Sequence, residues 1–331
     1  MKKYFYLFIV FCITVLSSVT SCHKNNGLTK ITVAEVTHSL FYAPQYIAIN
    51  KGYFKEEGLQ VDVITTPGAD KTMAALLSKE ADIGLMGPEA SVYVYNGGEE
   101  NYAINFAQLT HKDGSFLLAR EEMPNFKWTD LKGKTIIGGR KGGMPEMTLE
   151  YVLKKQGLQI GQNDPNAEVN IRTDVNFDVM AGVFTAGQSD FVTLFEPSAS
   201  QVVRNGIGHI VASVGKEAGE VPYTCYSATK KYIESNQDTL MAFNRAIKKG
   251  IEFVLTSDIS EIVNALKQSF VSSDDIEIKN VINNYLSIDV WSSDLTLTEE
   301  SYNRLIEIIT LAGELNSDAA PYEKIVNNSF I

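Results

Sequence analysis

The feature that most constrains the fold of this chain is a repeated alternation of short strand-like segments with helical ones. Residues 31–36, 59–64 and 82–85 are rich in β-branched and aliphatic side chains, and helix-forming segments lie between them. Strands that alternate with helices pair in parallel, because each helix returns the chain to the edge where the previous strand began. The first part of the chain is therefore predicted to form an α/β unit.

The alternation resumes after Arg120, and the chain later changes character. Strands are predicted over 134–137, 169–172, 191–195 and 210–214. From Tyr232 onward only helices are predicted, roughly over 237–256, 259–270, 275–287 and 298–315. We therefore expect an α/β fold of two lobes, with parallel-rich sheets flanked by helices and a helical C-terminal tail.

The lobe boundaries follow from where the alternation is interrupted. The chain is expected to cross between lobes near 115–120 and again near 222–228. Lobe 1 is then residues 30–117 together with 225–331, and lobe 2 is residues 118–221. A chain of this length can bury two cores of ordinary size.

The N-terminus has the pattern of a secretory signal. Lys2 and Lys3 precede an apolar run over 4–16, which is shorter than the roughly 20 residues that span a bilayer. The sequence Val-Thr-Ser-Cys ending at Cys22 resembles the bacterial lipoprotein box, which implies removal of residues 1–21 and lipid on Cys22. The alternative is an ordinary cleaved signal with an incidental cysteine. Residues 22–29 are interpreted as a tether that holds an extracytoplasmic body at a bacterial membrane.

Charge and cysteine content exclude several classes of function. Of 29 Lys and Arg residues two lie in the signal, so 27 basic and 40 acidic residues leave a net charge of −13. Such an acidic body is not expected to bind nucleic acid or, without its lipid, an anionic membrane. Besides Cys22 the mature chain keeps only Cys225, so neither an internal disulfide nor a thiolate metal cage is expected. No metal, cofactor or catalytic residue is predicted, and the body is expected to be a monomer.

Several motifs occur in order along the mature chain. They are THSLFYAPQYIA from Thr37, KGYFKEEGL from Lys51, ADIGLMGPE from Ala81, LKGKTI from Leu131 and FEP from Phe195. Together they resemble the extracytoplasmic solute-binding proteins of ABC importers for sulfonates, nitrate, taurine or thiamine-pyrimidine precursors. The resemblance implies the type II periplasmic-binding-protein fold, a small-molecule ligand held between the lobes and an ABC permease as partner.

Ligands of open α/β sheets bind beyond the carboxyl ends of the strands, which selects particular loops. The loop after the first strand supplies polar and aromatic groups suited to a planar ligand, although the two rings could instead pack the lobe. The loop before the helix at 70–79 supplies a glycine whose backbone a ligand can approach. The residues predicted from these two loops are His38, Ser39, Phe41, Tyr42 and Gly68.

Two further loops are predicted to contact the ligand. Gly87 and Glu89 begin a helix, where an acid could face a ligand amine or simply oppose the helix dipole. The glycine-rich loop over 138–146 lacks the spacing of a phosphate loop, but its backbone amides could bind an anion. Its predicted contacts are the amides of Gly142, Gly143 and Met144.

The last predicted site residues are Glu196, Tyr223 and Thr224. Glu196 follows a buried strand, so its carboxylate could pair with an amidine-like edge or cap the helix that begins at Pro197. Tyr223 and Thr224 lie on the second crossing. Two carboxylates against one basic loop favour a nitrogen heteroaromatic or zwitterion over a simple anion.

The leading functional hypothesis is therefore a lipid-anchored solute-binding protein rather than an enzyme. One alternative is an enzyme similar to the thiamine-pyrimidine synthases, which the chain also resembles over the two lobes. The resemblance implies that those enzymes hold iron with a cysteine-rich motif, which this chain lacks. Another is a lipoprotein that senses a ligand and signals to a partner. The histidines at 23, 38, 111 and 209 are scattered and form no catalytic motif.

Overall fold

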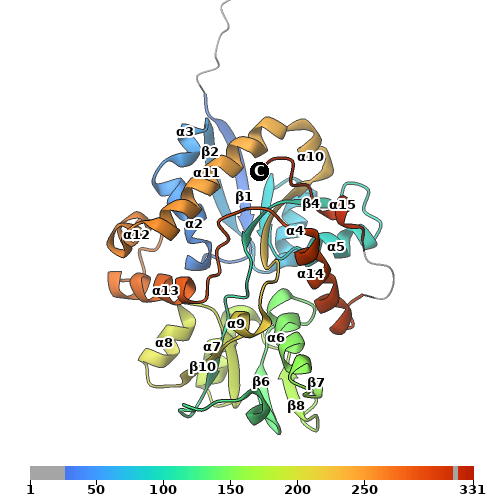
Figure 1. The fold of residues 1–331 in the computed structure, drawn as a ribbon, viewed down its shortest axis with the longest axis vertical. Coiled ribbons are helices and arrows are strands. Elements are labelled where there is room, and N and C mark those ends of the chain that lie inside the picture. Colours follow the sequence, from blue (N-terminus) through green and yellow to red (C-terminus); the bar gives the residue numbers. More distant parts are fainter. Residues whose placement is uncertain (1–26, 316–319) are drawn as a thin grey trace, which may run out of the picture.

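The computed structural model describes residues 27–315 and 320–331, which form two mixed β-sheets flanked by helices (Figure 1). Each sheet and its helices occupy one half of the molecule in this view. The predicted α/β fold with two sheets and a helical tail is confirmed. The signal segment, Cys22 and the first part of the tether lie outside the described residues.

The first sheet has five strands in the order β2-β1-β3-β11-β4. They are β1 (Thr29–Glu35), β2 (Leu59–Thr65), β3 (Ile83–Met86), β4 (Ala103–Thr110) and β11 (Thr224–Thr229). β1 pairs in parallel with β2 and β3, as the alternation predicts. β11 runs antiparallel to both β3 and β4, because it enters this sheet from the other half of the molecule.

Helices cover both faces of the first sheet. From the N-terminal part come η1 (Leu40–Tyr42), α2 (Ala43–Asn50), α3 (Tyr53–Glu56), α4 (Ala69–Ser78) and α5 (Glu89–Asn96). α2 begins with Pro44 in its first turn, where proline leaves no intrahelical hydrogen bond unmade. It packs against the long helix α11 (Gln237–Thr256) at Gly250, where an added Cβ would lie 2.2 Å from the Pro44 carbonyl oxygen.

The second sheet has six strands in the order β10-β5-β9-β6-β8-β7. They are β5 (Phe116–Ala119), β6 (Lys134–Ile137), β7 (Ile160–Gln162), β8 (Val169–Arg172), β9 (Phe191–Leu194) and β10 (His209–Ser213). The central pairs are parallel, whereas β5 is antiparallel to both β9 and β10. The connecting helical elements are η2 (Trp128–Leu131), α6 (Met144–Lys155), η3 (Phe177–Val179), α7 (Met180–Thr185), α8 (Ser198–Arg204) and α9 (Val214–Ala218).

The chain passes between the sheets through residues 111–115 and 219–223, which run side by side. The Val221 amide donates to the His111 carbonyl (2.9 Å), and the Tyr223 amide donates to the Thr110 carbonyl (3.1 Å). The crossings were expected near 115–120 and 222–228, and those segments include the strands β5 and β11 that the crossings lead into.

The C-terminal part beyond β11 is mostly helical. It contains α10 (Lys230–Ser235), α11, α12 (Ile259–Leu266), α13 (Asp275–Ser287), α14 (Glu299–Leu311) and α15 (Tyr322–Ile325). Hydroxyl and carboxylate caps define several starts: Thr229, Asp274 and Thr298 each accept an amide of the first turn. α14 packs against α6 and so reaches the second sheet's half (Figure 1).

The hydropathy of the helices bears on membrane attachment. Among residues 27–315 and 320–331, none of the helices combines the length and apolar character needed to cross a bilayer.

Candidate ligand site at the junction of the two sheets

Aromatic rings from both halves of the molecule meet where the sheets join. The ring of Phe41, in η1, lies 5.6 Å from that of Phe195 and 5.9 Å from that of Tyr223. Tyr285 of α13 completes the group, 5.2 Å from Phe41. Gly114 permits this packing, because a Cβ there would lie 2.4 Å from the Phe41 ring. The structure thus brings Phe41 and Tyr223 together, with Phe41 buried among aromatic neighbours.

Ser39 and Glu196 meet at the same junction. The Ser39 hydroxyl donates to the Glu196 carbonyl oxygen (3.4 Å), and the Glu196 amide donates to the Tyr285 hydroxyl (3.1 Å). The buried Glu196 carboxylate accepts from the Ser200 amide and hydroxyl (2.9 and 2.8 Å) and from the Asn284 side chain (2.6 Å). The carboxylate therefore satisfies the first turn of α8, as the capping alternative describes. Its contact with a ligand remains a prediction.

Tyr42 and Thr224 lie on the first sheet's side of the junction. Tyr42 is buried, and burial together with nearby Glu35 raises the pKa of its hydroxyl far above the usual value. Thr224 accepts a hydrogen bond from the Thr110 hydroxyl (2.9 Å) and lies close enough to Tyr42 to lower that pKa slightly. Both groups are therefore neutral hydrogen-bonding partners at ordinary pH.

Glu89 is an acid held away from water at the start of α5. Glu89 is only 2% exposed, and burial raises the pKa of its carboxyl to about 7. The amides of Glu89, Met144 and Ala90 and the charge of Arg140 act in the opposite direction. Its Oε2 atom has no hydrogen-bond partner in the structure. A buried carboxyl oxygen without a donor is costly, which makes it a candidate contact for a ligand.

Gly87 allows this position of the Glu89 carboxyl. A Cβ at residue 87 would lie 2.0 Å from Glu89 Oε2, so the carboxyl could not occupy its place beside any larger residue. Gly87 thus contributes to the site by making room for an acid.

The glycine-rich loop before α6 faces the first sheet's half. Its Arg140 lies 3.2 Å from Asp70 in α4, next to Gly68. The Gly142 carbonyl accepts from the Tyr93 hydroxyl of α5 (3.1 Å). The loops carrying Gly68, Glu89 and Gly142 are therefore brought together across the junction.

Two of the predicted amides in this loop already donate hydrogen bonds within the protein. The Gly142 amide donates to Glu146 Oε2 (3.2 Å), and the Gly143 amide donates to the Arg140 carbonyl (3.1 Å). The Met144 amide interacts with the Glu89 carboxyl. The sequence predicted these amides as anion contacts, and in the structure those of Gly142 and Gly143 donate to the protein's own oxygens.

Glu146 and Asp113 are buried acids that the sequence analysis missed. Burial and the neighbouring Glu150 raise the pKa of Glu146 to about 8, and burial raises the pKa of Asp113 to about 7. Asp113 lies on the first crossing; its Oδ1 accepts the Ser115 amide (2.6 Å) while Oδ2 has no partner. For Asp113, the polar Lys-Asp-Gly-Ser segment that begins at Lys112 was the available signal.

His38 points to a different neighbourhood. Its ring nitrogens lie 2.7 Å from the Tyr46 hydroxyl and 2.8 Å from the Ser269 carbonyl oxygen, and the ring stacks on Phe270. Hydrogen bonding to Glu35 raises the pKa of the imidazole, while burial lowers it. These contacts tie η1 to the segment after α12 rather than to the Glu89 group.

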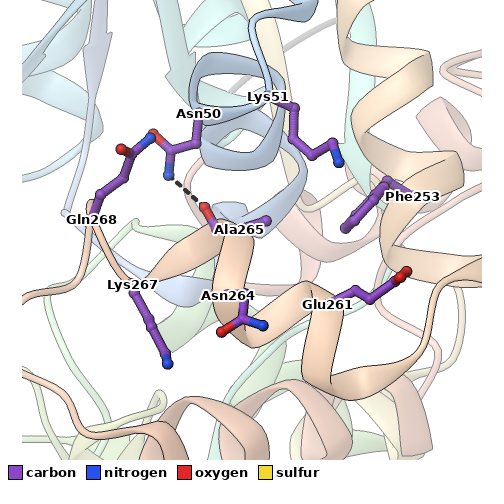
Figure 2. A pocket seen from close by; sticks show the side chains of 8 residues that line it. All are labelled: Asn50, Lys51, Phe253, Glu261, Asn264, Ala265, Lys267 and Gln268. Atoms are coloured by element: carbon purple, nitrogen blue, oxygen red, sulfur yellow. Dashed lines mark hydrogen bonds between the residues drawn. The ribbon is translucent and has the colours of Figure 1, made fainter.

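Two surface pockets lie away from the junction. One, of about 610 Å³, lies between α2, α11 and α12, where the Lys51 ammonium sits 4.4 Å from the centre of the Phe253 ring (Figure 2). The other, of about 300 Å³, is bordered by Met123 and Ile210. Neither pocket is lined by a predicted site residue.

In the part of the chain that the structure describes, no three His, Cys, Asp or Glu side chains are grouped to hold a metal ion. Cys225 is a buried free thiol in β11, and burial raises its pKa.

Two α/β sheets joined by paired crossings, with loops of both meeting at the junction, define the periplasmic-binding-protein fold. Comparison of the sequence with known families agrees with this class. The family described as "NMT1/THI5 like" matches residues 41–258, and the chain belongs to that family.

The chain is similar to two individual proteins in sequence and to a solved binding protein in fold. It is 45% identical over 315 residues to "Putative binding protein YtlA" of Bacillus subtilis (strain 168), covering 95% of this chain and 92% of the relative. It is 24% identical over 238 residues to 4-amino-5-hydroxymethyl-2-methylpyrimidine phosphate synthase of Aspergillus parasiticus, covering 68% and 67%. The alkanesulfonate-binding protein SsuA of Xanthomonas axonopodis pv. citri, solved with bound MOPS, has a similar fold: TM-score 0.69, 15% identity, and 91% and 98% coverage.

Proposed function

We propose that this chain is the lipid-anchored solute-binding component of an ABC importer, which captures a small polar solute at the junction of the two sheets. The observation that carries the proposal is the 45% identity, over almost the full length, to a relative named as a binding protein. The proximity of Phe41, Tyr42, Glu89 and Tyr223 supports it, since the sequence predicted all four as ligand contacts, the first three from loop position and Tyr223 from the second crossing.

The proposed mechanism needs no chemistry at the ligand. Lobe 1, residues 30–117 with 225–331, and lobe 2, residues 118–221, close on the solute, and the closed form is the one a permease recognises. Only a solute that binds the closed form better than the open one can shift this equilibrium. Contacts between the halves, such as the Tyr93 hydroxyl on the Gly142 carbonyl, support this view, because they would stabilise closure.

The proposed ligand is a nitrogen heterocycle such as a thiamine-pyrimidine precursor, with a sulfonate or taurine-like solute as the second candidate. The aromatic group around Phe41 suits a flat ring, and buried carboxyls suit its amino groups. The protein is proposed to act as a monomer outside the cytoplasm, anchored to a bacterial membrane through lipid on Cys22.

A second candidate function is pyrimidine synthesis, favoured by the 24% identical relative. The residues present do not support it, since Cys225 is the single cysteine among the described residues and is buried in β11. A role in signalling instead of transport would use the same ligand site and a different partner.

Isothermal titration calorimetry with thiamine pyrimidines, taurine, an alkylsulfonate and nitrate tests the proposal. We expect saturable one-to-one binding of a pyrimidine that Glu196→Gln weakens. Tight binding of nitrate or an alkylsulfonate that survives Glu196→Gln would overturn the preference for a heterocycle. Conversion of any of these compounds would overturn the binding-protein assignment itself.

A further inference from the structure

The first turn of α6 is where a small oxyanion would ordinarily bind, because exposed amides and the helix dipole both attract negative charge. In this protein two acids lie beside that turn. Glu146 Oε2 accepts the Gly142 amide just before the helix, and the Met144 amide lies near enough to the Glu89 carboxyl to lower its pKa. Both acids are buried, with Glu146 fully so and Glu89 2% exposed. An incoming oxyanion would therefore meet two carboxyls beside the amides of this turn.

Glu89 also retains binding capacity that nothing in the structure uses. Its Oε2 atom is buried and lacks a hydrogen-bond donor. The atom is held at that point because Gly87 leaves room for it. Tyr42 and Tyr223 lie close enough that the Glu89 charge raises the pKa values of both hydroxyls. The Glu89 carboxyl therefore lies near the hydroxyls of Tyr42 and Tyr223.

From this arrangement we infer that Glu89 makes the site selective for a ligand that donates hydrogen bonds from a cationic nitrogen, such as an amidinium or a protonated amine, and that Glu89 excludes small oxyanions. The inference rests on the proposed solute-binding function and decides between the two ligand classes left open there. Glu89 contacts the ligand directly through Oε2, while Gly87 acts as a positioning residue.

Selectivity of this kind is linked to pH. Burial raises the pKa of Glu89 to about 7, and a cation requires the ionised form, so its binding strengthens as pH rises through 7. Between pH 6 and pH 8 the ionised fraction grows about tenfold, which predicts an about tenfold fall in the dissociation constant of a permanent cation.

Several other titratable groups face Glu89 from the surrounding elements. They are Tyr42 of η1, Tyr93 of α5, Tyr223 of the second crossing, Cys225 of β11, and Arg140 of the loop before α6. Burial raises the pKa values of the three hydroxyls and the thiol, so these groups stay neutral between pH 6 and 8. Glu146, with a pKa raised to about 8, titrates in the same range. Because Glu146 is still present in Glu89→Gln, the pH dependence that remains in this variant measures the contribution of Glu146.

The test uses two probes with the same flat ring and opposite head groups, benzamidine and benzenesulfonate. Calorimetric titration of the mature protein at pH 6 and pH 8 should show benzamidine binding that is about tenfold tighter at pH 8, and weaker or no binding of benzenesulfonate. Glu89→Gln should weaken benzamidine binding at pH 8 at least tenfold and remove most of the pH dependence. Gly87→Ala should act in the same direction, since it displaces the carboxyl without removing it.

Glu100→Gln is the matched control, because it removes a carboxylate from an exposed position in the loop that follows α5. It should leave the binding of both probes unchanged. The inference is overturned if benzamidine fails to bind, if benzenesulfonate binds as tightly, or if Glu89→Gln and Glu100→Gln behave alike. Circular dichroism and thermal melting of each variant establish that it folds. If the protein retains a solute from its host but does not bind benzamidine, this inference is overturned and the proposed function is still supported.

Discussion

The buried acid on the first crossing gives the sharpest prediction for stability. Asp113 is fully buried, and burial raises the pKa of its carboxyl from 3.8 to about 7. Because the pKa in the folded protein lies above that in the unfolded chain, the folded protein retains the proton between about pH 4 and pH 7. The resulting stabilisation is complete below about pH 4 and is lost as the pH rises through about 7.

The size of the effect follows from the shift. Three pKa units correspond to about 4 kcal/mol in total, of which about 3 kcal/mol is lost between pH 5 and pH 8. Asp113→Asn keeps an oxygen for the Ser115 amide but carries no titratable proton. We therefore expect the variant to gain about 3 kcal/mol of unfolding free energy relative to wild type between pH 5 and pH 8.

Urea unfolding of the ligand-free protein, followed by tryptophan fluorescence and circular dichroism at pH 5 and pH 8, measures this difference. Asp62→Asn, at an exposed position in β2, is the control and should track wild type at both pH values. A constant difference between Asp113→Asn and wild type at the two pH values would refute the reasoning, because it would mean that Asp113 ionises without penalty.

Two further predictions concern the anchor and the packing of α11. Cys22→Ser should release the body from membranes or leave uncleaved precursor, measured by fractionation and immunoblotting. Wild-type protein found in the soluble fraction would contradict the lipid anchor. Gly250→Ala should destabilise the fold by about 2 kcal/mol or more, because its Cβ would lie 2.2 Å from the Pro44 carbonyl oxygen. Gly182→Ala in α7, where a Cβ meets open space, should show no such loss in the same urea titration.

The strand pattern of this chain was readable because its strands are short β-branched runs separated by helical segments. The expected strands over 59–64, 134–137 and 169–172 agree closely with β2, β6 and β8. The pattern did not identify the antiparallel strands, because β5 and β11 follow the crossings and enter their sheets in the opposite direction. β4 was not predicted, since its Gln108 and Thr110 interrupt the apolar pattern and yet are buried.

Some residues predicted as ligand contacts lie near one another in the structure. Loop position indicated Phe41, Tyr42 and Glu89, because the ends of neighbouring strands share one edge, and the second crossing indicated Tyr223. Their contact with a ligand stays a prediction. Sequence could not reveal that the Gly142 amide is taken by Glu146, which lies on the following helical turn. Nor could it reveal that Glu196 accepts from Asn284, a residue 88 positions away. Long-range partners of this kind depend on packing that no local pattern encodes.

The central claim is that this chain holds a small solute at the junction of its two sheets. Native mass spectrometry of the protein purified from its own host tests it most directly, with denaturing spectra of the same sample as reference. We expect one small molecule per chain that is released intact on denaturation and is lost in Glu89→Gln. A native mass equal to the polypeptide alone, unchanged by pyrimidines, taurine, alkylsulfonates or nitrate, would contradict the account.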